Sequence, residues 1–314
     1  MAPVIQCLPA AIGFCGRTAW LLLALIGTAA VAGEAQQLLT VASAQSAPAK
    51  DTAAKPPWGR IVMVGASVTA GFTASEPLGG PNTPQYCLSR YVDAAVAVPH
   101  ESTRNLAHAM FFIQPDAEGR RQIDQAIQAG PTLVIGLDFL FWFCYGQGRT
   151  ENERLQHFEK GLELLEAARC PLVVGDIPDA SAAANRVLNA SEIPSIQTRS
   201  AANRRLKEWA AKRPKVVILP LSGFMRAVTA DQALTIHGLT LPAGKTHVLL
   251  QDDQLHPSPP GCAVLALAIL DAFQSTRPGP SSGEVRWNPK EVFRVAITPA
   301  QEPSGESATR LLKQ

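Results

Sequence analysis

The chain has 314 residues, of which 46% are hydrophobic and 17% are charged, so it can bury a sizeable core in one large domain or two small ones. Its formal net charge is only +2, and its Lys and Arg residues are scattered along the chain. This excludes a concentrated basic surface, and nucleic acid is not an expected partner.

The N-terminus has the features of an export signal. Arg17 precedes an apolar run over residues 19–32 that is too short for a stable membrane span, and small residues follow it. Cleavage is expected after Ala32 or Ala44, which assigns residues 1–44 to a signal peptide and leader and 45–57 to a flexible linker. An uncleaved membrane anchor is the alternative. We therefore expect a periplasmic or extracellular protein, with no stable membrane insertion once the signal is removed.

Apolar strands alternate with amphipathic helices between residues 58 and 275. Buried parallel strands are predicted at 60–66, 132–137, 171–176 and 215–220, where Val, Ile and Leu run almost without interruption. Helices are predicted over 85–97, 117–129, 151–169, 196–212 and 260–274. This alternation predicts one α/β domain, a three-layer α/β/α sandwich with a doubly wound, mainly parallel sheet.

Three further segments have weaker patterns. An extra strand is expected somewhere between residues 98 and 112, and residues 237–250 suggest a hairpin that turns at 242–244. Residues 276–314 form a tail that is rich in Pro, Gly and Ser at its start. Within this tail, Glu291–Thr298 alternates like a strand and is predicted to add to a sheet edge.

Four cysteines lie beyond the expected signal, and none forms a C-x-x-C pair, so a zinc site is not indicated. An exported location allows a disulfide, and Cys87–Cys144 is the preferred pair because both residues follow strand-end loops near the candidate site. Cys170 and Cys262 are more simply interpreted as buried thiols.

A serine after the first predicted strand and an Asp-His pair near the end of the domain suggest nucleophilic catalysis. Ser67 lies in G-A-S-V-T-A-G, residues 65–71, and Asp253 and His256 lie in D-Q-L-H-P, residues 253–257. A serine nucleophile needs a histidine to take its proton and a carboxylate to orient the imidazole. Ser67, His256 and Asp253 are therefore predicted as a catalytic triad. The alternative is that Ser67 caps a helix.

Other chemistries fit the sequence less well. The nucleophile elbow of the α/β-hydrolases requires G-x-S-x-G, but Thr69 stands two residues after Ser67. Asp252, Asp253, His247 and His256 do not have a spacing that places three metal ligands on one face. We therefore expect neither a metal nor a cofactor.

The two end motifs resemble those of the SGNH, or GDSL, hydrolases. G-A-S-V-T-A-G is similar to the family's first block, G-D-S-x-x-x-G, with Ala66 in place of the aspartate, and D-Q-L-H-P-S-P-P-G is similar to its last block. The resemblance spans residues 60–273 and implies a flavodoxin-like sandwich and hydrolysis of an ester bond. It also implies Ser67 as nucleophile, His256 as general base and acid, and Asp253 as the orienting carboxylate.

The middle blocks of that family match less closely. Asp138, in G-L-D-F, stands where the family has an asparagine that donates to the oxyanion. A protonated Asp138 could still donate, or Asp138 could cap the turn that follows it. The family's second block has a glycine whose backbone N–H completes the oxyanion hole. In N-L-A-H-A, residues 105–109, Ala107 or Ala109 is expected to offer a backbone N–H in its place. Asn105 or His108 is a candidate for contacting substrate.

An aromatic segment follows Asp138. F-L-F-W-F-C-Y-G, residues 139–146, either walls an apolar acyl or aryl pocket beside Ser67 or packs in the core. The sequence thus indicates an exported, monomeric serine esterase for a small-molecule, carbohydrate or lipid ester. The alternative is a catalytically impaired ligand-binding or scaffolding protein with the same fold.

Overall fold

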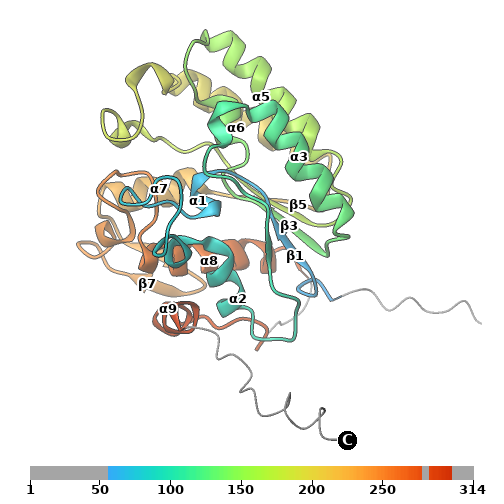
Figure 1. Cartoon of the computed structure of the whole chain (residues 1–314), viewed down its shortest axis with the longest axis vertical. Helices are drawn as coiled ribbons and strands as arrows, with labels where there is room; N and C mark the ends of the chain where they lie inside the picture. The colour runs from blue at the N-terminus through green and yellow to red at the C-terminus, as the bar shows by residue number, and fades with distance from the viewer. Residues whose placement is uncertain (1–55, 278–282, 299–314) are drawn as a thin grey trace, which may run out of the picture. The chain divides into compact units, whose positions relative to one another are not determined.

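A computed structural model describes residues 56–277 and 283–298 of the chain. Within them five strands form a parallel sheet in the order β2-β1-β3-β4-β5 (Figure 1). Their bounds are Ile61–Met63 (β1), Arg104–Asn105 (β2), Leu133–Gly136 (β3), Leu172–Gly175 (β4) and Val216–Leu219 (β5). The four predicted strands and the extra strand between residues 98 and 112 are therefore confirmed.

Helices cover both faces of this sheet, which confirms the predicted three-layer α/β/α sandwich (Figure 1). One layer contains α3 (Pro115–Gln128), α5 (Glu151–Leu165) and α6 (Ile196–Ala211), and the other contains α2 (Leu88–Ala95), α7 (Leu221–Thr229), α8 (Pro259–Gln274) and α9 (Pro289–Ile297). All of the predicted helices are present, whereas α7, which begins directly after Pro220, was not predicted from the sequence.

The side chains of β1 and of Val64, which follows it, alternate between the two layers of the core. Ile61 and Met63 pack in the cluster that contains α2 and α8, and Val62 and Val64 pack in the cluster that contains α3 and α5. All four side chains are fully buried. This two-sided burial is the reason for the uninterrupted apolar sequence of the strand.

The C-terminal segment differs from its prediction. Residues that alternate like a strand form α9, in which Val292 and Ala296, four residues apart, are buried on one helical face. Asn288 caps this helix by accepting from the backbone N–H of Lys290 and Glu291, at 3.0 and 3.4 Å. The predicted edge strand is therefore wrong, and the packed part of the chain continues past residue 275.

The predicted hairpin exists, but its turn was placed too late. Strands β6 (Leu234–Ile236) and β7 (Leu239–Leu241) pair antiparallel, and the turn between them is His237 and Gly238. Both turn residues have positive φ, 49° and 75°. A two-residue hairpin loop favours this backbone, which Gly adopts freely.

The cysteines of the described residues are all free, so the predicted Cys87–Cys144 disulfide is wrong. Cys87 is half-buried and its Sγ accepts a hydrogen bond from the Asn105 amide at 3.1 Å. Cys144 is buried, and burial raises the pKa of its thiol to about 12. Cys262 is a buried thiol, as predicted, and Cys170 is half-buried.

Among the residues that the structure describes, none of the helices is long and apolar enough to cross a membrane. The expected signal peptide, its cleavage sites and nearly all of the linker lie outside these residues, as does the end of the tail from residue 299.

Ending the chain after Arg277 is expected to destabilise the domain, because this removes α9 and exposes the faces of α2 and α8 that α9 covers. Loss of the burial of Val292 alone should lower the free energy of unfolding by about 2 kcal/mol. Ending the chain after Thr298 keeps α9 and is the matched control. Thermal unfolding followed by circular dichroism compares the two, and equal midpoints would contradict the prediction.

Candidate active site

The turn that carries Ser67 follows β1 directly, next to the point where the strand order reverses between β1 and β3. Ligands of open α/β sheets bind at the carboxyl ends of the strands at this point. Ser67 is the first residue of the single-turn helix α1 (Ser67–Ala70). Gly65, just before it, has φ of 150°, and a Cβ there would lie 2.1 Å from the Asp138 carboxylate. The tight start of this turn therefore requires glycine.

Ser67, His256 and Asp253 form one hydrogen-bonded chain. His256 Nε2 lies 2.8 Å from Ser67 Oγ, and His256 Nδ1 lies 2.8 Å from Asp253 Oδ2. The imidazole and the carboxylate are buried, whereas Ser67 is partly exposed. The structure thus brings together the three residues that the sequence pairs, with the serine on the solvent side.

The hydrogen bonds around Asp253 favour its ionised form, the carboxylate. Its Oδ1 accepts from the backbone N–H groups of Leu255 and His256, both at 2.9 Å. Burial raises the pKa of the Asp253 carboxyl, but the hydrogen bonds from the His256 side chain and the two backbone groups outweigh it, so the pKa lies below its usual value. An ionised Asp253 fixes the proton of His256 on Nδ1 and leaves Nε2 to accept from Ser67.

Two residues that the sequence did not single out hold the imidazole in place. Gln251 donates from its side-chain amide to the carbonyls of Phe72 and Pro257, at 2.7 and 2.9 Å, and from its backbone to the carbonyl of His256 at 2.8 Å. The Phe72 ring stacks on the imidazole with centroids 4.1 Å apart. Gln251 thus links the histidine loop to the loop after Ser67. A glutamine two residues before Asp253 carries no sequence signal of this role.

Asp138 fixes the serine turn. Its Oδ1 accepts from the Ala66 N–H at 3.0 Å and the Thr69 hydroxyl at 2.6 Å, and its Oδ2 accepts from the N–H groups of Val68 and Thr69 at 2.9 and 3.3 Å. Burial raises the pKa of the Asp138 carboxyl, and these hydrogen bonds only partly offset that rise. Asp138 therefore caps α1, the turn of the nucleophile, and not the turn that follows Asp138 in the chain.

Two backbone donors remain available beside Ser67. Within the described residues, the N–H groups of Ser67 and Ala109 donate to no protein acceptor, whereas the N–H of Ala107 donates to the Asn105 side chain at 3.0 Å. Ala109 lines the same cavity as Ser67 and His256. Of the two alanines that the sequence left open, Ala109 is therefore the one with a free donor.

The side chain of Asn105, a candidate for contacting substrate, is hydrogen-bonded to other groups of the protein. Its amide nitrogen donates to the carbonyl of Thr69 at 3.0 Å and to Cys87 Sγ at 3.1 Å, and its oxygen accepts from Ala107. It is not among the residues that line the cavities at Ser67. Asn105 therefore ties the end of α1 to the loop after β2.

Two cavities meet at Ser67, Trp142 and Leu255. The larger, which we name the cleft, has a volume of about 440 Å³ and is lined by Phe72, Leu78, Ala109, Met110, Phe112, Val187 and His256, among others. The smaller, which we name the inner pocket, has about 30 Å³ of open space and is lined by Asp138 and by apolar side chains that include Phe141, Leu221, Phe224, Met225 and Leu265. Ser67 thus lies at the junction of an open and a nearly filled cavity.

Both expectations for the aromatic segment after Asp138 are met in part. Phe139 and Phe143 are fully buried in the core beside α3 and α5. Phe141 and Trp142, in the short helix α4 (Phe141–Cys144), line the inner pocket, and Trp142 also lines the cleft. The segment therefore supplies one wall of the site.

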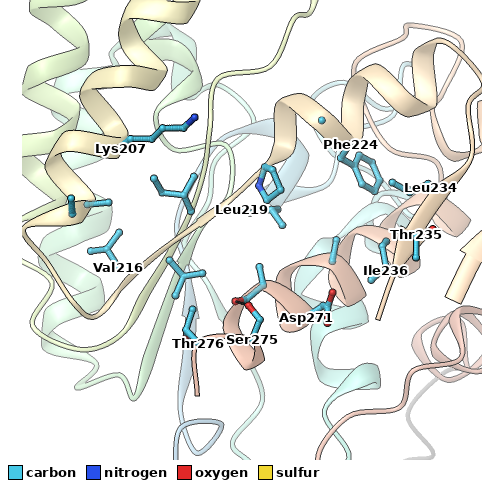
Figure 2. Close-up of a pocket in the computed structure, with 18 residues that line it drawn as sticks. Lys207, Val216, Leu219, Phe224, Leu234, Thr235, Ile236, Asp271, Ser275 and Thr276 are labelled. Atoms are coloured by element: carbon cyan, nitrogen blue, oxygen red, sulfur yellow. Dashed lines mark hydrogen bonds between the residues drawn. The ribbon is translucent and has the colours of Figure 1, made fainter. Parts of the chain in front are cut away.

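A cavity of about 750 Å³ lies against the edge strand β5, between α6, β6 and α8 (Figure 2). Its charged lining residues are Lys207, on α6, and Asp271, on α8. Phe224 lines both this cavity and the inner pocket, and so stands between them. The described residues that line this cavity include no histidine, and hence no triad, so the junction at Ser67 is the candidate active site despite its smaller volume.

The four residues considered as metal ligands in the sequence, Asp252, Asp253, His247 and His256, do not gather at one point. His247 pairs with Asp231 at 2.9 Å, Asp253 pairs with His256, and Asp252 is exposed. In the part of the chain that the structure describes, no three His, Cys, Asp or Glu side chains gather as a metal site.

Asp176 and His237, to which the sequence assigns no role, contact residues outside the candidate active site. The Asp176 carboxylate accepts from the backbone N–H and the hydroxyl of Ser222, both at 2.6 Å, and so caps α7. His237 pairs with Asp271 at 3.0 Å and stacks on Trp287 with centroids 3.6 Å apart. Neither residue lines the cleft or the inner pocket.

Comparison with known proteins gives structural matches without sequence matches. No family model matches the chain, and no curated protein matches it. A lipase/acylhydrolase from Enterococcus faecalis matches 71% of this chain with all of its own, at 15% identity and a TM-score of 0.46. An acetylxylan esterase from Geobacillus stearothermophilus matches 69% with 96% of its own, at 15% identity and a TM-score of 0.46. A putative acylhydrolase from Bacteroides fragilis matches 69% with 88% of its own, at 17% identity and a TM-score of 0.43. Matches at these identities and TM-scores do not assign a function to this chain.

Proposed function

We propose that this chain is a serine esterase of the SGNH type, which cleaves an ester through a Ser-His-Asp acyl-enzyme mechanism without a cofactor. The observation that carries the proposal is the continuous chain from Asp253 through His256 to Ser67, with 2.8 Å at each link. The motifs that resemble the SGNH blocks contain these same three residues, which is a second and independent support.

The first half of the reaction forms an acyl-enzyme. His256 Nε2 takes the proton of Ser67 Oγ as that oxygen attacks the ester carbonyl carbon. The carbonyl π electrons move to the oxygen, and the free N–H groups of Ser67 and Ala109 stabilise the resulting oxyanion. When the tetrahedral intermediate collapses, the C–O bond to the alcohol breaks, and His256 gives its proton to the leaving oxygen.

The second half releases the acid. A water molecule gives a proton to His256 Nε2 and attacks the acyl carbon, and Ser67 leaves with the proton that His256 returns to it. Asp253 remains ionised throughout and stabilises the imidazolium that forms in each half.

A catalytically impaired ligand-binding or scaffolding protein is the second candidate function. Asp138 favours it, because both of its oxygens accept hydrogen bonds from the serine turn and neither donates to an oxyanion. Loss of one such donor typically raises the barrier by about 3 kcal/mol. The two N–H groups at Ser67 and Ala109 favour the esterase, since they leave a hole with two donors.

We further propose that the protein is exported and acts in the periplasm or outside the cell, as a monomer. The support for export is the sequence: Arg17, the apolar run over residues 19–32 and the small residues at the two candidate cleavage sites.

Labelling with a fluorophosphonate probe, together with turnover of p-nitrophenyl esters, tests the esterase. We expect wild type to be labelled on Ser67 and to turn over a short-chain ester, and Ser67→Ala to do neither. Ser75→Ala, at an exposed serine on the next loop, is the matched control and should behave as wild type. A folded wild type with no label and no turnover would instead support the binding protein.

A further inference from the structure

The cavities at Ser67 differ in which catalytic groups they contact. The cleft is lined by His256 and Ala109 as well as by Ser67, whereas the inner pocket is lined by Ser67 but by neither of the other two. The two halves of a bound ester are therefore not interchangeable between the cavities.

Proton transfer places the alcohol half in the cleft. His256 has to protonate the leaving oxygen, and a general acid must lie within hydrogen-bond reach of the atom that it protonates. The oxyanion points to Ala109, which also lines the cleft. The inner pocket is then the space that remains for the substituent on the acyl carbon.

The inner pocket admits a very small group. Its open space is about 30 Å³, against about 440 Å³ for the cleft. Its walls are core side chains, among them Met225, 5% exposed, and Leu265, 2% exposed. Well-packed walls of this kind resist extra methylene groups. We therefore expect room for a methyl or ethyl group, whereas a longer alkyl chain would have to displace the core.

The cleft is roomy and mainly apolar. Its volume of about 440 Å³ lies in the range of small-molecule sites. Phe72, Met110 and Trp142 line it, and Leu78 and Phe112 at its rim are 82% and 44% exposed. Large apolar side chains left in solvent at the mouth of a site indicate that an apolar ligand covers them.

We infer that the substrate is an ester of a two- or three-carbon acid with a bulky, largely apolar alcohol. This inference rests on the proposed esterase function and adds to it the division of the ester between the two cavities. The acyl group occupies the inner pocket against Met225, and the alcohol occupies the cleft against Phe72, Phe112 and Trp142.

The acyl half is tested with p-nitrophenyl acetate, propionate, butyrate and octanoate. We expect kcat/KM for acetate or propionate to exceed that for octanoate by roughly tenfold or more, since one surplus methylene already costs roughly that much in a filled pocket. Met225→Ala enlarges the inner pocket, which lowers the cost of each surplus methylene of the acyl chain. It should therefore reduce this ratio by roughly threefold or more. Met225→Leu keeps the volume and should leave the ratio unchanged.

The alcohol half is tested with two acetates whose alcohols have similar acidity. We expect kcat/KM for 2-phenylethyl acetate to exceed that for ethyl acetate by roughly tenfold, and Phe112→Ala to reduce this preference. Ile127→Ala is the matched control, because Ile127 is equally exposed, at 46%, but lies on α3 away from the cleft.

The possible failures are distinguishable. Wild type that hydrolyses octanoate as well as acetate, or that shows no preference for the phenylethyl ester, overturns the division of the ester while Ser67 labelling upholds the esterase. If Met225→Ala fails to fold, the wild-type acyl series still decides. Absence of both Ser67 labelling and turnover overturns the esterase and this inference with it.

Discussion

Asp253→Asn is expected to lower kcat by roughly 10⁴-fold, the loss seen when the orienting carboxylate of a serine triad is changed to its amide. The side-chain oxygen of the new asparagine would stay with the backbone N–H groups of Leu255 and His256, which can only donate. The amide NH₂ would then face His256 Nδ1, where Oδ2 of the native carboxylate accepts at 2.8 Å. The imidazole would have to carry its proton on Nε2, and Nε2 could no longer take the proton of Ser67.

Asp252→Asn is the matched control for this variant. Asp252 is the neighbouring carboxylate, it is exposed, and it contacts Arg186 through its backbone carbonyl, which accepts at 2.6 Å. It should keep wild-type kcat. The comparison uses steady-state turnover of a short p-nitrophenyl ester, with circular dichroism to show that both variants fold. An Asp253→Asn enzyme within about tenfold of wild type would contradict the role of Asp253, because the loss in such triads is far larger.

The sequence predicts most of the sheet and the reacting residues because both depend on local patterns. Strands buried on both faces are apolar without interruption, as at Ile61–Met63 and Leu133–Gly136. Asp253 and His256 are three residues apart on one turn, so their pairing needs no knowledge of the fold. The carboxyl ends of parallel strands meet at one edge of the sheet, which places Ser67 there.

Long-range contacts account for what the sequence could not predict. Asp138 reaches the turn of Ser67 across a separation of 70 residues, and Gln251 reaches Phe72 across 179. The apolar positions of Glu291–Thr298 suit a strand. This segment is nevertheless a helix, because in that form Val292 and Ala296 lie on one face and pack against α2 and α8. Cys87 and Cys144 follow strand-end loops, yet Cys144 is buried beside α5 while Cys87 contacts Asn105.

Asp138→Asn is expected to weaken both the fold and the activity, although asparagine is the residue at this position in the SGNH block that the sequence resembles. An asparagine has one acceptor oxygen, whereas the Ala66, Val68 and Thr69 N–H groups need acceptors on both sides of the carboxylate. If the amide NH₂ replaces Oδ2, the N–H groups of Val68 and Thr69 lose their acceptor. If it replaces Oδ1, the Ala66 N–H loses its acceptor. A buried donor without a partner costs about 1–3 kcal/mol, and that is the expected loss in free energy of unfolding.

The activity should fall because Asp138 aligns the turn on which Ser67 and its free N–H stand. Misplacement of a reacting group by about 1 Å costs on the order of 10²-fold in rate, so we expect a fall of that size in kcat with little change in KM. Asp176→Asn is the matched control: Asp176 is also a buried carboxylate after a strand and caps α7 through Ser222, but it does not contact the serine turn. It should keep wild-type kcat and lose less stability, because an asparagine there keeps one oxygen for the Ser222 N–H and its amide can donate to the Ser222 hydroxyl. Urea unfolding and ester turnover, measured on both variants, separate the two effects. A more active Asp138→Asn enzyme would contradict this role, because it would mean that position 138 serves the oxyanion and that the carboxylate impairs it.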